Sequence, residues 1–556
     1  MWVRELKRKT TKNVAVQIVR NYRNDQGKPR LKIVRHMGSA PEGPALEALV
    51  RVATLELHRL KEEAQPSLFP AAEGIDEILQ VRRQNQTTRP LPIKDARALE
   101  EKKRLCVGFH EVCGTLYDQM GFADVFTGRQ TMARRLFKQE VLLRLAAPGD
   151  SKRAHARHLS KEDGLEVPVE KFYRMMDAVT DTRIRRLQSL VAHEVTGLLD
   201  GKVDVLFFDV TTLSFASDKE DALRKKGYSK DGKPHRVQVV LALIQTQQGL
   251  PIGYELFAGN TAEVTTLEPA IAELKQRFML ERVVFVADAG MMSKENLALL
   301  RSRGYDYVVA ARMRSMGAQV TEQITGPQDW QEAPNGRKVA ERLIGGQRLI
   351  LRYCPKKAAK DAHTREEAIE KAKKRLTAGI KGKGKGGRFL QVDRGAVRLN
   401  EEAIEKDKKF DGLHGVWTSL EASLASPQQV VAQYRELWRI EEGFRVLKST
   451  LAVRPIFHWT ERRVQAHVAI CFVAFAVLRI LRYRYNTMHG GNEPLSEARI
   501  LSELRQVETS VLVDRNTNNL YALPSAANGT QIRLYKAVGQ SLQRTTVLLK
   551  EGTSSR

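Results

Sequence analysis

Two short apolar runs in this sequence each end in an aspartate, and this pattern constrains the fold more than any other feature. The run VDVLFFD ends at Asp209, and the run RVVFVAD ends at Asp288. Short runs rich in valine and phenylalanine predict buried strands. A carboxylate at the end of a buried strand is costly unless a metal ion or hydrogen bonds satisfy it. A turn or a helix cap is the plainer alternative for each aspartate.

A third acidic residue, Glu441, lies in a segment that predicts a helix. Ser426, Pro427 and Gln429 indicate where that helix begins. Serine caps a helix, proline suits the first helical position, and a glutamine three residues after the cap reaches back to it. We expect one helix to run from this point past Glu441.

The helical period selects Glu441 over its neighbour Glu442. A step of seven residues turns an α-helix by about 700°, so Tyr434, Glu441 and Lys448 fall within about 20° of one stripe. Glu442 is turned away by about 100°, whereas Arg445 flanks the stripe. An aromatic side chain, an acid and two cations on one face suit a metal-bound phosphate. An ion-paired surface stripe would show the same pattern.

The segments around the two aspartates alternate between strand and helix patterns. Strands are expected at 203–209, 236–245, 251–259, 282–288 and 305–312, and helices at 266–278 and 294–304. The second and third strands read as a hairpin with a turn at Gln248 and Gly249. The resulting order β, β, β, α, β, α, β is that of an RNase H-like sheet.

The charge balance of the chain points to a polyanionic partner. Lys and Arg number 92 against 65 Asp and Glu, which gives a net charge of +27 and a pI near 9.9. Nucleic acid is the simplest partner for such a chain, and a merely solubilising charge is the alternative. Four scattered cysteines without a CxxC pair argue against a disulfide framework or a standard zinc site.

No feature of the sequence predicts a membrane or secretory role. The basic start MWVRELKRKTTK lacks the apolar run of a signal peptide. The apolar stretch at 468–478 is too short to span a bilayer and predicts a buried helix. We therefore expect a cytoplasmic protein.

Three segments are candidates for DNA contact. Residues 1–40 show short β-like bursts with 11 basic and 2 acidic residues, which fits a DNA-binding hairpin or a solvated arm equally. Residues 151–179 read as helix, turn, helix, a pattern shared by many proteins that do not bind DNA. The tract at 356–388 carries lysines on a glycine-rich backbone that can follow phosphates or serve as a linker: Lys381, Lys383 and Lys385.

The three acids suit metal-dependent chemistry at a phosphodiester. Two divalent ions roughly 3.5–4 Å apart activate an oxygen nucleophile and stabilise the leaving oxygen. Magnesium prefers carboxylate and water oxygens, with Mn²⁺ as the alternative ion. We expect two ions per active site, with Asp209 bridging both, Asp288 holding one and Glu441 the other. His235 and His467 are left out, because lone histidines are more often structural.

The same blocks resemble a known family. Tyr434, Glu441 and Lys448, with WRIEE before FRVLK, look like the tyrosine-arginine-glutamate-lysine signature of bacterial insertion-sequence transposases of the DDE class. FFDVTTLSF, GYELFAGNTAEVTTL and VADAGMMSKENL match other blocks of that family, so the resemblance covers about 200–485. It implies cleavage at transposon ends, joining of the 3′ hydroxyl to target DNA, and a homodimer that pairs two terminal inverted repeats of double-stranded DNA. It also implies that Tyr434 and Lys448 hold DNA phosphates.

One position departs from the signature. Leu437 stands where the family has its arginine, four residues before the glutamate. Arg445, Arg439 and Arg435 are the candidates to replace it, and Arg445 has the best helical angle. The departure leaves open whether the flanking cut passes through a DNA hairpin. Trp417 and Trp438 are candidates to stack on an unpaired base, although aromatic side chains mostly serve packing.

The resemblance completes the predicted architecture. We expect an α/β fold, with an RNase H-like catalytic core, a β-rich insertion before the glutamate helix and a mainly helical N-terminal region. The predicted parts are a small basic β-rich segment at 1–45, a mainly helical candidate DNA-binding region at 46–200, the core at 201–315 and 421–488, a β-rich basic insertion at 316–420, and a helical C-terminal region at 489–556. Two rival functions remain, a catalytically silent DNA-binding relative and a metal-dependent nuclease without strand transfer.

Overall fold

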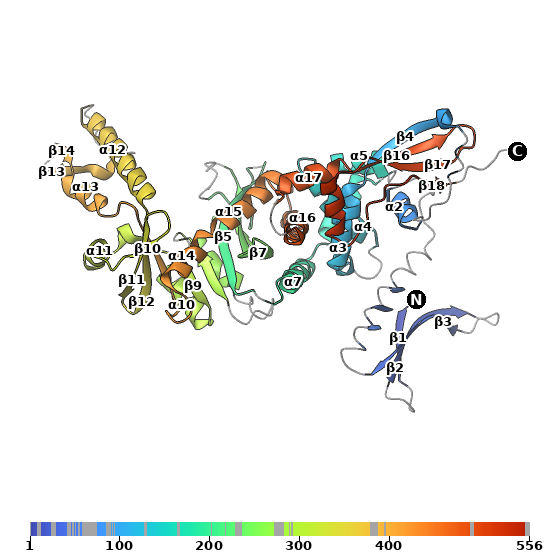
Figure 1. Cartoon of the computed structure of the whole chain (residues 1–556), viewed down its shortest axis with the longest axis horizontal. Helices are drawn as coiled ribbons and strands as arrows, with labels where there is room; N and C mark the ends of the chain where they lie inside the picture. The colour runs from blue at the N-terminus through green and yellow to red at the C-terminus, as the bar shows by residue number, and fades with distance from the viewer. Residues whose placement is uncertain are drawn as a thin grey trace. The chain divides into compact units, whose positions relative to one another are not determined.

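The structure is a computed structural model that separates into two compact units, Met1–Gly74 and Ile75–Arg556 (Figure 1). It describes residues 2–7, 13–23, 29–41, parts of 46–57, and 75–550 apart from 85–90, 92, 94, 127–130, 164–166, 202, 217, 228–235, 272–282, 289, 291–292, 378–386, 394–395 and 490–493.

The first unit contains a three-stranded antiparallel sheet in the order β1 (Trp2–Lys7), β2 (Asn13–Arg23), β3 (Pro29–Pro41). The middle strand buries consecutive side chains from residue 14 to 19, so both of its faces are covered there. All three strands lie within residues 1–45. The described residues between 46 and 57 are helical.

A nine-stranded mixed sheet forms the centre of the second unit. Its first part runs in the order β7 (Pro251–Ala258), β6 (Gln238–Thr246), β5 (Val205–Ser214), β8 (Val284–Ala287), β9 (Asp306–Ala310). Strands β5, β8 and β9 are parallel to one another, whereas β6 is antiparallel to both of its neighbours, β5 and β7. Helices α8 (Leu267–Ile271) and α10 (Lys294–Ser302) fall between these strands, so the predicted order of elements is confirmed.

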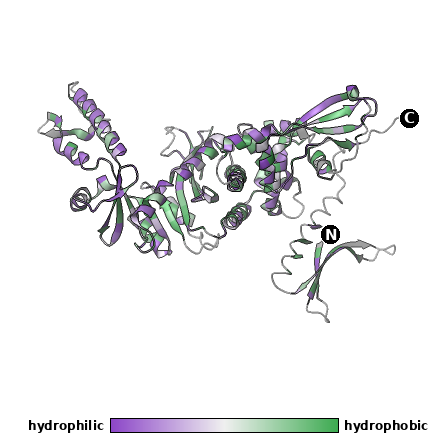
Figure 2. Ribbon diagram, in the orientation of Figure 1, coloured by the Kyte–Doolittle hydropathy of each residue, from purple (hydrophilic) through white to green (hydrophobic). Residues whose placement is uncertain are grey.

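The insertion extends this same sheet. Strands β10 (Gln331–Ala333), β11 (Arg337–Ile344), β12 (Gln347–Tyr353) and β15 (Leu413–Thr418) are antiparallel, and β15 pairs with β9. The hairpin turn between β11 and β12 lies at Gly345 and Gly346, and both glycines have positive φ. The rest of the insertion consists of α11 (Ala318–Thr325), α12 (Pro355–Thr377), β13 (Leu390–Asp393), β14 (Ala396–Leu399) and α13 (Glu401–Lys408). In Figure 2, α12 is largely hydrophilic, as a solvated helix should be.

Helices that precede and follow the strands of the nine-stranded sheet in the chain pack together. They are α2 (Ile75–Gln84), α3 (Gly114–Gln119), α4 (Thr131–Ala146), α5 (Lys152–Asp163), α6 (Val169–Asp177), α7 (Asp181–Leu198) and α16 (Glu461–Met488). Helix α16 contacts α4, α6 and α7. It is long and apolar enough to cross a membrane, but 94% of its most apolar window is buried inside the protein. The prediction of a buried core helix is therefore confirmed.

Two predicted helical regions contain strands. Within 100–200, β4 (Leu99–Cys106) pairs antiparallel with β16 (Glu508–Asp514). The C-terminal region, predicted as helical, holds β16, β17 (Leu520–Pro524) and β18 (Val547–Lys550) besides α17 (Glu497–Arg505) and α18 (Gly529–Lys536). The charged sequence LEEKKRLC has no strand pattern of its own. It is a strand because a segment about 400 residues away supplies the hydrogen bonds, and local sequence does not report such a partner.

The remaining described elements are short turns of helix: η1 (Ala96–Ala98), η2 (Phe109–Cys113), η3 (Phe122–Val125), η4 (Glu263–Thr266), η6 (Met313–Ser315) and η7 (Gly387–Phe389).

Candidate active site

The register of two parallel strands brings the two aspartates together. Phe207 of β5 pairs with Val286 of β8. Two residues further along both strands, the same register places Asp209 opposite Asp288. Neighbouring strands lie about 4.8 Å apart, and register partners in a parallel pair point to the same face. The two carboxylates are thus neighbours on one face of the sheet.

Asp209 lies inside its strand, and the prediction that it ends the strand is wrong. Strand β5 continues to Ser214 because β6 pairs with it from Leu206 to Ser214. Only the parallel partner β8 stops near this point, at Ala287. Asp209 is half-buried, and its Oδ1 accepts a hydrogen bond from the Val210 backbone N–H at 2.8 Å. Asp288 follows β8 and is exposed.

Helix α15 (Trp438–Arg445) covers the face that carries the aspartates. Phe207 pairs with Gln245 of β6, so their side chains share a face. The Gln245 amide lies so close to Gly443 that a Cβ on the glycine would be 2.3 Å from Nε2. Asp209, two residues beyond Phe207, points to the same side. The strand register and this helix contact together place Asp209, Asp288 and the glutamate helix on one face.

The segment before Glu441 is two helices and not the single helix predicted. Helix α14 (Pro427–Arg435) begins with the predicted capping box, in which Ser426 and Gln429 exchange hydrogen bonds. It ends at Arg435, and α15 begins at Trp438. Between them the Leu437 N–H donates to the Tyr434 carbonyl oxygen at 3.1 Å, a spacing of three residues.

The break is a tightened turn, which changes the angles on which the predicted stripe rested. An ion pair between Glu436 and Arg439, at 2.6 Å, has the three-residue spacing that such a turn aligns. Beyond α15, η8 (Val446–Thr450) widens into π-type turns. An unbroken step of 100° per residue therefore does not describe the path from Tyr434 to Lys448.

Tyr434 nevertheless lies near both acids. Burial, followed by the negative charges of Asp288 and Glu441, raises the pKa of the Tyr434 phenol to about 12. A charge acts on a phenol in this way only from nearby. Tyr434 therefore connects Asp288 at the strand end with Glu441 on α15.

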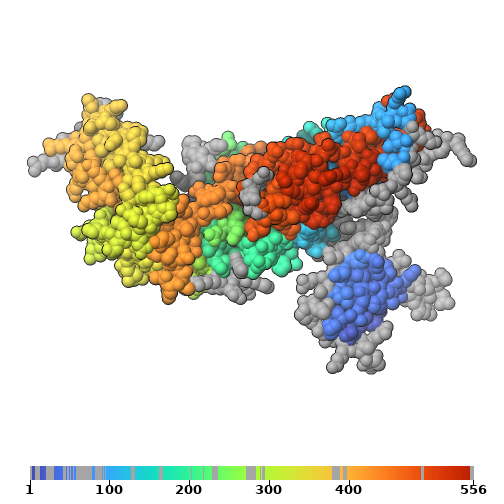
Figure 3. Space-filling model, viewed as in Figure 1, coloured from blue at the N-terminus to red at the C-terminus, as the bar shows by residue number. Residues whose placement is uncertain are grey.

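The two adjacent glutamates have different surroundings. Glu442 forms ion pairs with Arg479 at 3.1 Å and Arg482 at 3.5 Å, both on α16. Burial alone would raise the pKa of Glu442, but these two arginines lower it. Glu441 is exposed, and no described residue forms an ion pair with it. On the face shown in Figure 3, the orange atoms that include α14 and α15 reach the surface.

The donor chemistry of this face suits a hard divalent cation. Carboxylate oxygens are the ligands that Mg²⁺ and Mn²⁺ prefer. Among the residues that the structure describes, no group of three or more His, Cys, Asp and Glu side chains is positioned to hold a metal ion. Asp209 and Asp288 are neighbours by register, and Glu441 shares their face without closing a three-ligand site.

The other predicted residues divide into surface and core positions. Lys448 is half-buried on η8, and Arg445 is exposed at the end of α15. Trp438 is 47% exposed, with the Arg439 guanidinium 5.0 Å from its ring centroid. Trp417 of β15 packs against both hydrophobic core clusters, which indicates a packing role. Three predicted lysines lie outside the described residues: Lys381, Lys383 and Lys385.

Leu437 packs against the main core, as an apolar side chain would. Arg439, one candidate to replace the signature arginine, is paired with Glu436. His467 is buried, and burial lowers its pKa well below the ordinary value. Its Nε2 lies 2.9 Å from the Val453 carbonyl oxygen, which fits the structural role expected for it. His235 lies outside the described residues.

Residues of the site escaped prediction because they come from the insertion or from loops. The ring of His414, on β15, lies 5.2 Å from the ring of Tyr434. Burial lowers the pKa of His414 to about 4, helped by the charge of Arg352 on β12. Glu263 lies beside Gly290, since a Cβ on that glycine would be 3.2 Å from its Oε2. Only Glu263 had a signal in the sequence, because it belongs to the block GYELFAGNTAEVTTL.

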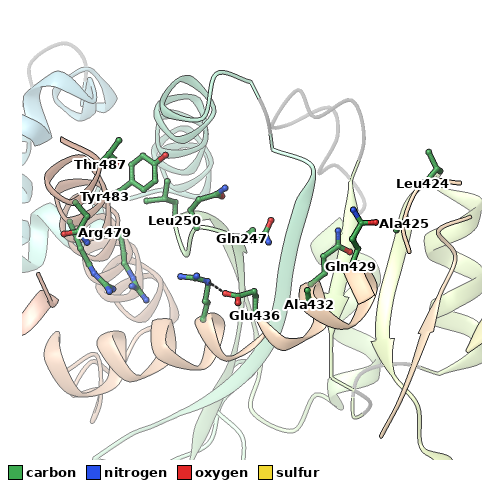
Figure 4. Close-up of a pocket in the computed structure, with 15 residues that line it drawn as sticks. Gln247, Leu250, Leu424, Ala425, Gln429, Ala432, Glu436, Arg479, Tyr483 and Thr487 are labelled. Carbon is green, nitrogen blue, oxygen red and sulfur yellow. Dashed lines mark hydrogen bonds and ion pairs between the residues drawn. The ribbon is translucent and has the colours of Figure 1, made fainter. Parts of the chain in front are cut away.

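A cavity of about 1000 Å³ lies on another side of α14 and α15 (Figure 4). Gln429, Gln433, Glu436 and Arg479 are among its lining residues, and none of the three predicted acids is. It is separate from the acidic face.

The large mixed sheet with helices packed on it is consistent with the RNase H-like fold of DDE transposases. The family described as Transposase DDE domain matches residues 200–477, half of the chain, and the chain belongs to this family. It is therefore a DNA transposase of the DDE type, a class of enzymes that cleave DNA and transfer its strands with divalent metal ions.

Similarity outside the family match is low. A piggyBac transposase synaptic complex with hairpin DNA is 13% identical, with a TM-score of 0.37, over 71% of this chain and 76% of that chain. A Mos1 transposase paired-end complex with left transposon end is 14% identical, with a TM-score of 0.14, over 48% of this chain and 78% of that chain. No curated protein matches the sequence. The assignment rests on the family match.

Proposed function

We propose that the protein is the transposase of a bacterial insertion sequence, and that Asp209, Asp288 and Glu441 form its catalytic site. It binds the terminal inverted repeats of the element, cuts at their ends and joins the 3′ hydroxyl to target DNA. The observation that supports this most strongly is the shared face, on which the β5–β8 register pairs the aspartates beneath the helix of Glu441.

The three carboxylates would hold two magnesium ions, with manganese as a substitute. When bound, such ions activate the attacking oxygen and stabilise the leaving oxygen. Glu441 completes the site by moving toward the aspartates when DNA and metal bind, since catalytic contacts often tighten only in the complex. Glu442 stays on α16 through Arg479 and Arg482 and fixes the position of α15.

The cations and aromatic side chains beside the acids would bind DNA. Lys448 and Arg445 bind backbone phosphates, and the Tyr434 hydroxyl donates a hydrogen bond to one, because its pKa keeps it protonated. Exposed Trp438 would stack on an unpaired base. The net charge of +27 would hold the enzyme on DNA in the bacterial cytoplasm, and a homodimer would pair two ends.

The test compares wild type with D209A in magnesium on DNA that carries the ends of the element, resolved on a denaturing gel. D209A should abolish cleavage and leave DNA binding intact. D204N is the matched control, because Asp204 is an exposed aspartate just before β5. Wild-type cleavage by D209A would refute the proposed site.

The products of the wild-type enzyme decide between the rival functions. Joined ends support a transposase, nicks alone indicate a nuclease, and binding alone indicates a silent relative. A hairpin-sized product would show that Leu437 does not prevent the hairpin route.

A further inference from the structure

A half-buried arginine on the insertion strand β12, Arg352, has no ion-pair partner among the residues that the structure describes. Arg348 and Arg352 both point toward α14, because Ile350 between them packs with the α14 side of the core. Arg348 forms an ion pair with Glu341 at 2.7 Å and donates to two backbone carbonyl groups. Arg352 is half-buried, and its buried Nε has no hydrogen-bond partner.

Two further arginines add to this unpaired charge. Arg337 on β11 and Arg435 on α14 both repel Arg352, and after burial their charges lower its pKa. Among the described residues, none of the three forms an ion pair with a carboxylate. We call Arg337, Arg352 and Arg435 the arginine cluster. Like charges gathered beside a partly dry surface are costly unless an anion joins them.

A neighbouring thiol shows that this place favours negative charge. Cys354 comes two residues after Arg352, just before α12 begins. Its pKa is lowered by the Lys357 backbone N–H, with further contributions from the Arg337 side chain and the Lys356 N–H. The same N–H groups and arginine would stabilise a phosphate oxygen.

The sheet register fixes where the cluster lies relative to the acids. Ala287 pairs with Val309 on β9, so Asp288 falls opposite Ala310, which pairs with Val416 on β15. Val416 pairs with Ile350 on β12. Arg352 is therefore three strands away from Asp288. It also lies two residues further along the sheet, in the direction in which β8 ends. Three strand spacings amount to about 14 Å, which puts the cluster beside the acids and not at them.

The residues between the two places are aromatic and uncharged. Arg352 pairs with His414 across the β12–β15 ladder, and the His414 ring packs against Tyr434. His414 is neutral at neutral pH, because its pKa is about 4. It adds no charge, and the charge of Arg352 still reaches Tyr434, whose pKa it lowers in part.

We propose that the arginine cluster binds a phosphate of the DNA backbone next to the one that is cut. The cluster then positions the DNA from the insertion side of the sheet, while Lys448 and Arg445 hold it from the helix side. Arg352 is a positioning residue in this scheme and does not touch the reacting atoms. The proposal rests on the proposed function, because it assumes DNA on the acidic face.

The test is the salt dependence of DNA binding by R352Q, followed by fluorescence anisotropy with labelled duplex DNA. Loss of one phosphate contact should lower the slope of log affinity against log salt by about 0.9. Affinity at low salt should fall about tenfold, the loss expected for a hydrogen bond to a charged group. R352K should recover the slope, because it restores the charge, and only part of the affinity.

R342Q is the matched control. Arg342 is on the same hairpin, but it lies on the side of Ala340 in the smaller core cluster, away from α14. It already pairs with Asp329 at 3.4 Å. The variant removes one positive charge and should leave the salt slope unchanged. Equal slopes for R352Q and R342Q would overturn the proposal.

A second readout does not depend on affinity. In a C106S background, Cys354 is the only one of the three remaining cysteines that is not buried, because Cys113 and Cys471 are buried. Bound DNA should slow its alkylation by iodoacetamide several-fold, since a phosphate covers the thiol and raises its pKa. Unchanged alkylation in saturating DNA would also overturn the proposal. If wild type neither binds nor cleaves DNA, the proposed function fails instead.

Discussion

The contact between Gly443 and Gln245 can be tested by substituting Gly443 with alanine. Packing and helix propensity predict changes of opposite sign in the free energy of unfolding for this variant. A Cβ on Gly443 would lie 2.3 Å from Gln245 Nε2, 2.9 Å from Oε1 and 3.0 Å from Cδ. Carbon atoms in contact sit about 3.5–4.0 Å apart, so the amide would have to move by more than 1 Å. Gln245 is fully buried, and the structure shows no hydrogen-bond partner for either amide atom.

Two opposing terms set the size of the effect of G443A. Overpacking a core costs about 1–3 kcal/mol. Alanine is favoured over glycine within a helix by about 1 kcal/mol. We expect the variant to lose about 0–2 kcal/mol of unfolding free energy, measured by urea unfolding with tryptophan fluorescence. Propensity alone would predict a gain of about 1 kcal/mol, and such a gain would refute the packing argument.

A double-mutant cycle locates the effect. Shortening the amide side chain in Q245A makes room for the new Cβ, so G443A should cost less in that background. The coupling energy should be about 0.5–2 kcal/mol, as for residues in contact. Because α15 carries Glu441, displacement of the helix should also slow cleavage, by up to about 100-fold for a shift of about 1 Å. Additive effects on stability would show that the two residues do not meet.

The remaining predictions concern charged groups. E441Q should abolish cleavage at unchanged stability. E442Q should retain cleavage and lose stability, because it leaves two arginines of α16 without this partner. The opposite pattern in paired melting and cleavage assays would exchange the roles of the two glutamates. Burial alone would raise the pKa of Glu140, but the charge of buried Lys152 lowers it to about 2, so E140Q should cost about 3–5 kcal/mol in urea unfolding by leaving that lysine unpaired. A cost below about 1 kcal/mol would contradict this. Burial, followed by the charge of Lys152, lowers the pKa of His458 from 6.5 to about 4. Between these pH values the unfolded chain binds more protons than the folded protein, so the free energy of unfolding should fall as the pH drops from 6.5 to 4. H458N should flatten that part of the pH–stability curve, and an unchanged slope would rule out the histidine as its cause.

Features that depend on neighbours in the chain could be predicted from the sequence. Ser426 caps its helix as expected, because a side-chain oxygen reaches a backbone N–H only three residues ahead. The hairpin turn at Gly345 needs only a residue that tolerates positive φ. The alternation of strands and helices, and the family blocks on them, likewise follow from local pattern. The choice of Glu441 stays a prediction, supported by the ion pairs that hold Glu442 on α16.

Features that depend on distant partners could not. Strand β4 exists because β16 pairs with it, and β5 extends past Asp209 because β6 does. The break after Arg435 changed the helical angles on which the predicted stripe rested. The ion pair between Glu436 and Arg439 accompanies the tight turn there, and helical periodicity does not report it. The sequence does not distinguish Arg352 from the other basic residues. Its surroundings follow from the position of β12 beside β15 and α14.

The sequence by itself therefore determined which segments are strands and helices in the core, which acids they carry and to which family the pattern points. Tertiary structure alone decided that the β5–β8 register brings Asp209 and Asp288 to one face, that α15 lies over that face and that three arginines meet with no carboxylate partner among the described residues. The physical reason is range: caps, turns and periodicity act over a few residues. Strand register and charge clustering are set by packing between segments far apart in the chain.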